Sequence, residues 1–297
     1  MNIIIITLIF CTVLFLYLHI FFHLKMSDDL EVYEISSISK ERLEEICDLR
    51  QPVIFDYDIQ KLNSLTIANI LQNYNSFDIK IRNISNTYIE SEQELFLPLT
   101  LHNGLKVLDE DKNSKYISEN NGDFLEETSL TKIIQSNDEF LRPHMMMSYY
   151  YDYILGSKDS ITPLRYEKNY RNYFIVLSGS VKVKLTPPKS SKYLYPQYDY
   201  ENFEFRSLIN PWSIQDKYKI DFDKIKCMEV EFTAGKILFI PAYWWYSLKF
   251  EDSKTAIISL KYRTYMNTIA ISPSIFISFL QKQNIKHDIV GKITKIE

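Results

Sequence analysis

Apolar residues form an unbroken run near the start of the chain. Residues 3–24 read IIIITLIFCTVLFLYLHIFFHL and contain no Asp, Glu, Lys or Arg. A helix of this length spans roughly 33 Å, which is enough to cross a bilayer. The run is too long for a signal peptide and has no basic segment before it and no small-residue cleavage site after it. We therefore predict a transmembrane anchor over residues 1–25, since the alternative, a buried core helix, is rarely apolar on every face.

The pattern changes to an amphipathic helix over residues 40–49. Leu43, Ile46 and Cys47 fall on one face at helical spacing, and charged residues occupy the opposite face. Ser39 stands in front of the segment as a helix cap. Cys47 is therefore interpreted as a packing residue and not as a nucleophile.

The second half of the chain is a series of short apolar or alternating stretches, separated by Gly, Pro and Asn. Such stretches predict β-strands, and many short strands without helices between them indicate a sandwich or barrel. The polar residues 109–121 show no periodicity and are predicted as a loop. The predicted strands cover residues 146–155, 172–179, 181–185, 228–232, 236–241 and 256–265.

A helical extension is predicted over residues 268–297, after a main domain at 26–267. Its helix begins near Ser272 and Pro273, because a cap residue followed by proline is typical of a helix start. Ile275, Phe276, Phe279 and Leu280 then form one apolar stripe. The stripe could pair two copies of the chain into a homodimer or pack on its own barrel.

Composition and charge exclude several classes of protein. The net charge of −4 and the scattered basic residues provide no field for nucleic acid, and no glycine-rich loop is present to bind phosphates. The three cysteines have neither a disulfide framework nor zinc-ligand spacing, which favours a reducing compartment. Lys25, Lys40 and Arg42 follow the apolar run and favour a cytosolic domain, against the glycosylation sequon at Asn83, which we interpret as a chance match.

Two segments together resemble one known family. Residues 156–188 and 229–250 resemble the core strands of the JmjC-like cupins, the cupin-8 or cupin-like group of Fe(II)- and 2-oxoglutarate-dependent hydroxylases, and residues 50–58 resemble their opening strand. The most specific matches are Gly179 with the later Pro-Pro pair and the FIPAYWW stretch at 239–245. The resemblance implies a mainly β fold, a double-stranded β-helix of cupin or jelly-roll type with helical additions.

The resemblance also implies an iron site whose ligands have changed. In the family, a strand carries His-x-Asp or His-x-Glu and a second His follows an aromatic pair, so that two imidazoles and one carboxylate bind Fe(II). The matching positions are Arg165, Glu167 and Tyr246. The basic residue that pairs with 2-oxoglutarate in the family is matched by Val181, and the adjacent Lys182 should face the other side of its strand.

Other candidate residues do not restore the site. Thr162 matches a position that can contact the co-substrate, although a lone threonine is more often structural. None of the five histidines has an acidic residue two positions later, and the spacing does not support a site built from His144 and Glu167. The aromatic, acidic residues 192–203 are expected to form a loop that covers the barrel mouth.

The sequence thus predicts a membrane-anchored, non-catalytic cupin-like module with no bound metal or cofactor. Arg165 would supply the missing positive charge and pair with Glu167, and Tyr246 would donate to this pair or to a ligand. The pair could also serve stability alone, with no ligand. The ligand or partner would be an unidentified protein or small molecule, and the alternative function is an Fe(II)/2-oxoglutarate-dependent hydroxylase of a protein or small-molecule substrate.

Overall fold

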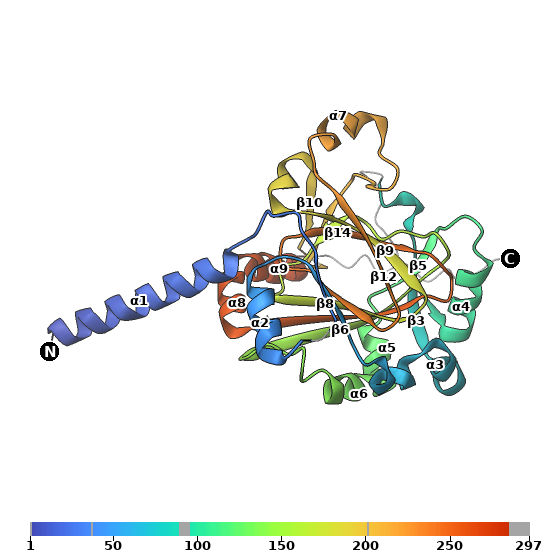
Figure 1. The fold of residues 1–297 in the computed structure, drawn as a ribbon, viewed down its shortest axis with the longest axis horizontal. Helices are drawn as coiled ribbons and strands as arrows, with labels where there is room; N and C mark the ends of the chain where they lie inside the picture. Colours follow the sequence, from blue (N-terminus) through green and yellow to red (C-terminus); the bar gives the residue numbers. More distant parts are fainter. Residues whose placement is uncertain (1, 37, 89–95, 201, 285–297) are drawn as a thin grey trace.

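Two sheets face each other across an apolar core in the computed structural model, which describes residues 2–36, 38–88, 96–200 and 202–284 (Figure 1). Neighbouring strands are antiparallel except for the pair β1 and β2. The larger sheet has the order β1 (Tyr33–Ile35), β2 (Val53–Asp56), β13 (Lys236–Phe239), β8 (Arg171–Ser178), β15 (Ala256–Thr264), β6 (Met146–Gly156), β5 (Tyr116–Ser118), β3 (Asp78–Asn83), β4 (Phe96–Thr100). The smaller sheet has the order β10 (Pro196–Asp199), β11 (Glu204–Ser207), β7 (Arg165–Tyr166), β14 (Trp245–Phe250), β9 (Ser180–Thr186), β12 (Met228–Thr233). The predicted cupin fold is confirmed.

Strand β8 shows why the sequence of a central strand is a continuous apolar run. Phe174 and Val176 point into the core between the two sheets, while Tyr173 and Ile175 pack on the opposite face with the helices. Both faces of the strand are covered, so every second residue is buried on one side and its neighbour on the other.

Strand β9 faces the solvent on one side, and apolar and polar residues alternate along it. Val181 and Val183 are fully buried between the sheets. Lys182 lies on the other face, where its ammonium group is 3.1 Å from the Glu251 carboxylate. The prediction that Val181 faces inward and Lys182 outward is confirmed.

Helices flank the larger sheet, and the first of them after α1 follows its sequence signals. In α2, Leu43, Ile46 and Cys47 are buried, and the Ser39 hydroxyl accepts a hydrogen bond from the backbone N–H of Arg42 at 3.3 Å. The helices are α1 (Asn2–Leu24), α2 (Lys40–Asp48), α3 (Ile67–Tyr74), α4 (Leu101–Glu110), α5 (Gly122–Glu127), α6 (Leu130–Asn137), α7 (Lys219–Phe222), α8 (Tyr265–Ala270) and α9 (Ser272–Asn284), with short 3₁₀ turns η1 (Ile59–Leu65), η2 (Ile84–Asn86), η3 (Pro188–Tyr193) and η4 (Asp216–Tyr218).

The predicted loop at residues 109–121 is wrong in its centre. Strand β5 lies there and pairs with β3 and β6 inside the larger sheet. Three residues are too few for an alternating pattern to be visible in the sequence, and only the two neighbouring strands define them. This strand brings Glu119 into the barrel.

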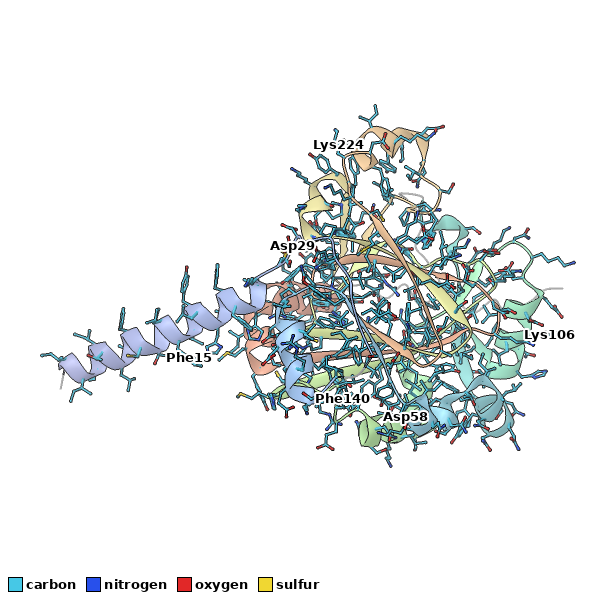
Figure 2. The ribbon with its side chains drawn as sticks, in the orientation of Figure 1. Phe15, Asp29, Asp58, Lys106, Phe140 and Lys224 are labelled. Atoms are coloured by element: carbon cyan, nitrogen blue, oxygen red, sulfur yellow. The ribbon has the colours of Figure 1, made fainter. Side chains whose placement is uncertain are left out.

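The two ends of the described chain expose apolar residues. Helix α1 projects away from the domain, and Figure 2 shows its side chains, Phe15 among them, extending on all sides. Residues Ile3–Leu24 are long and apolar enough to cross a membrane, and none of this window is buried. On α9, Phe276, Phe279 and Leu280 are 61%, 54% and 41% exposed, so this part of the stripe does not pack on its own barrel. The predicted extension beyond Asn284 lies outside the described residues.

Candidate functional site

The three positions that match the family's metal ligands lie together inside the barrel. Arg165 and Tyr246 are direct cross-strand partners on β7 and β14. The Tyr246 hydroxyl donates a hydrogen bond to Oε1 of Glu167 at 3.2 Å. Arg165 and Glu167 are buried, and Tyr246 is fully inaccessible. Their placement agrees with the two-residue spacing of the motif, which puts Arg165 and Glu167 on one face.

Arg165 pairs with carboxylates that the sequence did not connect with it. Its Nη2 donates to Glu119 at 2.7 Å and its Nη1 to Glu204 at 3.3 Å. The Arg82 guanidinium also contacts the Glu119 carboxylate. The predicted pair of Arg165 with Glu167 is therefore wrong: the buried carboxylate of Glu119, directly after β5, pairs with the guanidinium, and Glu167 pairs with Lys261.

The charge on Glu119 depends on these two arginines. Burial alone would raise the pKa of its carboxyl group, but the guanidinium groups of Arg165 and Arg82 outweigh this effect and lower the pKa to about 2. In turn, Glu119 helps to hold the pKa of Arg165 well above its ordinary value. The three side chains therefore form a network inside the barrel that is charged at neutral pH.

Glu167 is held by an ammonium group from the opposite sheet. The Lys261 Nζ on β15 donates to Oε1 at 2.6 Å, and Asn169 Nδ2 donates to Oε2 at 3.3 Å. Lys261 was not among the residues predicted for the site, although a signal was present: Ser259, Lys261 and Arg263 alternate with apolar residues along β15. This alternation places the three polar side chains on one face, toward the interior of the barrel.

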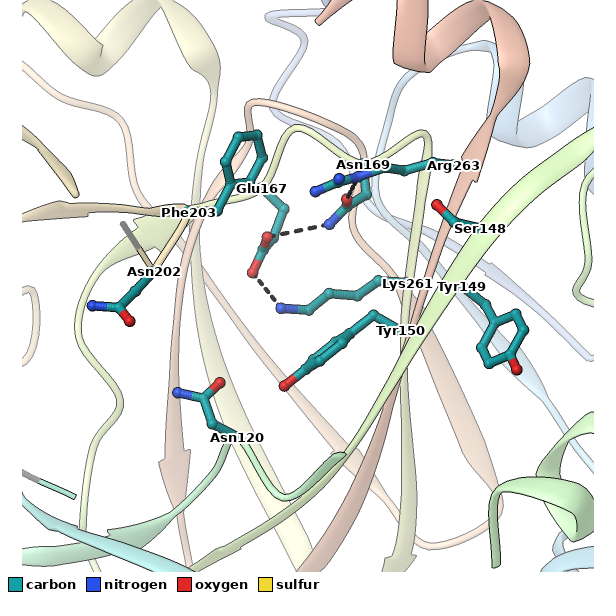
Figure 3. A pocket seen from close by; sticks show the side chains of 10 residues that line it. All are labelled: Asn120, Ser148, Tyr149, Tyr150, Glu167, Asn169, Asn202, Phe203, Lys261 and Arg263. Carbon is teal, nitrogen blue, oxygen red and sulfur yellow. Dashed lines mark hydrogen bonds and ion pairs between the residues drawn. The ribbon is translucent and has the colours of Figure 1, made fainter. Parts of the chain in front are cut away.

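A cavity of about 350 Å³ opens beside this ion pair (Figure 3). Arg263 donates from Nε to Asn169 at 2.6 Å, and its two Nη atoms have no hydrogen bond within the described part of the chain. Figure 3 shows the Tyr150 hydroxyl directed toward Asn120 and the Tyr149 ring turned away. This space, which we call the Lys261 cavity, is lined by Asn120, Ser148, Tyr149, Tyr150, Glu167, Asn169, Asn202, Phe203, Lys261 and Arg263.

The Lys261 cavity suits a polar or anionic ligand. Lys261 and Arg263 carry two positive charges against the single carboxylate of Glu167. Burial, followed by the Asp152 and Glu119 carboxylates, raises the pKa of Tyr150, so its hydroxyl stays protonated and can donate. Asn202 and Phe203 line the cavity from the end of the predicted covering segment 192–203, which also contains the strand β10.

The donor set at the motif positions does not fit Fe(II). A guanidinium group is always protonated and offers no lone pair to a metal. Burial is the main cause that raises the pKa of Tyr246 well above its ordinary value, so it remains a phenol. The carboxylate of Glu167 already accepts from an ammonium group. Within residues 2–284 as described, no group of three or more His, Cys, Asp or Glu side chains is arranged to hold a metal.

The two positions that the resemblance connects with the co-substrate lie in the interior as well. Thr162 is fully buried, and its hydroxyl accepts from the backbone N–H of Leu248 at 2.9 Å. Its carbonyl accepts from the Ser247 hydroxyl at 2.6 Å. Thr162 thus hydrogen-bonds the chain around it to β14. Val181 packs in the apolar core between the sheets.

Comparisons with known proteins agree with the fold. Residues 100–267 match the model of the cupin-like domain. JmjC domain-containing protein D of Dictyostelium discoideum is 30% identical over 95 residues, which cover 32% of this chain and 21% of that protein. HSPB1-associated protein 1 of Rattus norvegicus and of Homo sapiens is 28% identical over 106 residues, which cover 35% of this chain and 22% of each relative. The match thus spans about a fifth of the length of these curated relatives.

Proposed function

The chain belongs to the cupin-like domain family, and we propose that it acts as a membrane-tethered, non-catalytic binding module. The observation that carries this proposal is the ion pair between Lys261 and Glu167. The one motif position that keeps a metal-binding carboxylate is thereby neutralised by the protein's own cation. Iron is not needed to balance its charge.

The Lys261 cavity is the proposed binding site of the module. Its excess positive charge and the free Nη donors of Arg263 support an anionic group, such as a carboxylate, on a small molecule or on an exposed protein segment. Arg263→Gln should weaken binding of small dicarboxylates in a thermal-shift screen, whereas Arg206→Gln on β11 serves as the matched control away from the cavity lining. Equal responses in both variants would place the ligand elsewhere.

Membership of the family favours a second candidate, an Fe(II)/2-oxoglutarate-dependent oxygenase. The two functions differ in their need for metal. We expect the full-length chain, purified in detergent with Fe(II) and ascorbate supplied, to hold far less than one equivalent of iron and to leave 2-oxoglutarate unconsumed. Stoichiometric iron that is lost in Glu167→Ala, together with 2-oxoglutarate turnover, would overturn the non-catalytic proposal.

The proposed tether is α1, with the domain on the cytosolic side. Its apolar window and its projection from the domain support an anchor. The full chain should remain with membranes after an alkaline carbonate wash. Release into the supernatant would overturn the tether without bearing on the Lys261 cavity.

A second copy of the chain is the proposed partner of the apolar stripe on α9. The exposure of Phe276, Phe279 and Leu280 supports this pairing, since a contiguous apolar face on a helix is costly to leave in water. Sedimentation of the full chain in detergent should show a dimer that Phe279→Glu converts to a monomer. A monomeric parent protein would contradict the proposed dimer.

A further inference from the structure

The last turns of α1 pack against the domain. The His23 ring is buried, its Nε2 lies 3.3 Å from the Thr264 hydroxyl at the end of β15, and its centre is 5.0 Å from that of the Tyr170 ring. The guanidinium carbon of the buried Arg50 lies 5.1 Å from the centre of the Phe22 ring. These contacts fix the direction in which α1 leaves the domain.

The contact with the domain begins before the apolar run ends. A groove of about 550 Å³ lies between α1 and the domain, and Leu18, His19, Phe22 and His23 line it from the side of α1. Residues 3–17, which precede these four, span only about 22 Å as a helix, whereas the hydrocarbon core of a bilayer is about 30 Å thick. An α1 that crosses the bilayer therefore needs its last turns to complete the span. The part of the domain that packs on these turns then reaches the lipid headgroups.

The domain exposes apolar side chains beside the same turns. Met145, directly before β6, and Tyr265 and Met266 on α8 line the groove from the side of the domain. Met145 is 73% exposed and Tyr265 is 53% exposed, and Ile269, one turn farther along α8, is exposed as well. Figure 1 shows α8 next to the point where α1 leaves the domain. Gathered apolar side chains mark an interaction surface, and tyrosine is enriched where a membrane meets water.

We propose that this surface, which we call the anchor face (Met145, Tyr265, Met266 and Ile269), lies in the headgroup layer of the bilayer that α1 crosses. The inference rests on the proposed tether and goes beyond it, because a tether alone does not bring the domain onto the lipid. Ser148 and Arg263, which line the Lys261 cavity, stand three and two residues from Met145 and Tyr265 along the chain. Docking of the anchor face therefore holds the strands that line this cavity near the membrane surface.

The test uses the full-length chain with Cys11→Ser and Cys227→Ser in phosphatidylcholine vesicles, while the buried Cys47 is retained. A nitroxide label on Met145→Cys should collide more often with oxygen, which concentrates in lipid, than with a water-soluble nickel chelate. The matched control is Ile220→Cys, an exposed apolar position on α7, which Figure 1 shows away from α1. There the nickel chelate should collide more often than oxygen.

A second label, on Ile269→Cys, keeps the proposal testable if Met145→Cys fails to fold. Labels on the anchor face that meet the nickel chelate as readily as the control does, in a chain that resists the carbonate wash, would overturn the membrane contact and leave the tether in place. Labels shielded from both reagents, with spectra broadened by a neighbouring label, would show a second copy of the chain on this face and would also overturn it. Release of the chain by carbonate would overturn the tether itself, so the two failures can be told apart.

Discussion

Arg165 and Arg50 are both buried, but the molecule balances their charges differently. Arg165 lies inside the barrel between the carboxylates of Glu119 and Glu204. Arg50 lies at the junction with α1, where it meets aromatic rings and forms no ion pair within the described chain. A buried arginine that forms ion pairs recovers part of its desolvation cost, whereas one that meets aromatic rings without an ion pair recovers less.

The largest effect should follow the loss of the carboxylate that Arg165 and Arg82 share. Glu119→Gln keeps the shape of the side chain but removes the fully buried carboxylate that the guanidinium groups of Arg165 and Arg82 share. We expect the free energy of unfolding, measured by urea titration of the full chain in detergent, to fall by about 3–5 kcal/mol. Glu127→Gln on the exposed side of α5 is the control and should change little. A loss as small as that of the control would mean that the network contributes nothing to the fold.

A metal site should appear once the internal cations are removed. The variant with Arg165→His, Tyr246→His and Lys261→Ala combines two imidazoles with the freed carboxylate of Glu167. Ni(II) at a hundredfold excess over its Kd should then stabilise the fold by roughly 2.7 kcal/mol. The variant that retains Lys261 should respond much less, because its ammonium still occupies the carboxylate. No metal response in the triple variant would show that these positions cannot meet around one ion.

The network should also give a defined pH dependence. Folding lowers the pKa of Glu119 from 4.5 to about 2, so its stabilising contribution is fully present above pH 4.5 and is lost as the pH falls toward 2. The difference in unfolding free energy between the parent protein and Glu119→Gln should therefore shrink over this interval and stay constant above it. A difference that is the same at pH 3 and pH 7 would contradict the pairing.

The smallest effect is expected at the other arginine. In detergent, Arg50→Met should leave the free energy of unfolding unchanged or raise it by about 1 kcal/mol, because a buried charge without an ion pair is exchanged for an apolar side chain. Arg165→Met, measured in parallel, should be strongly destabilising. A large loss at Arg50 would show that its aromatic contacts alone stabilise the junction, and the contrast between the two arginines would disappear.

Local sequence patterns were sufficient to predict a residue's structural role where that role depends on its own helix or strand. The apolar run at residues 3–24, the Ser39 cap of α2 and the alternation of Val181 with Lys182 were all predictable. The two-residue spacing likewise put Arg165 and Glu167 on one inner face, and the resemblance of the motif strands to a known family implied the cupin fold.

The partners of the charged residues were decided by the tertiary structure alone. Glu119 and Lys261 stand 46 and 94 residues from Arg165 and Glu167, and only the packing of β5 and β15 around the barrel brings each pair into contact. An ion pair requires its nitrogen and oxygen atoms to lie within about 4 Å, so the choice between Glu167 and Glu119 as the partner of Arg165 depends on distances that sequence spacing does not encode. In the same way, the sequence determined that Arg50 precedes a buried strand, but the return of α1 and Tyr170 to one place decided that its charge is enclosed by aromatic rings.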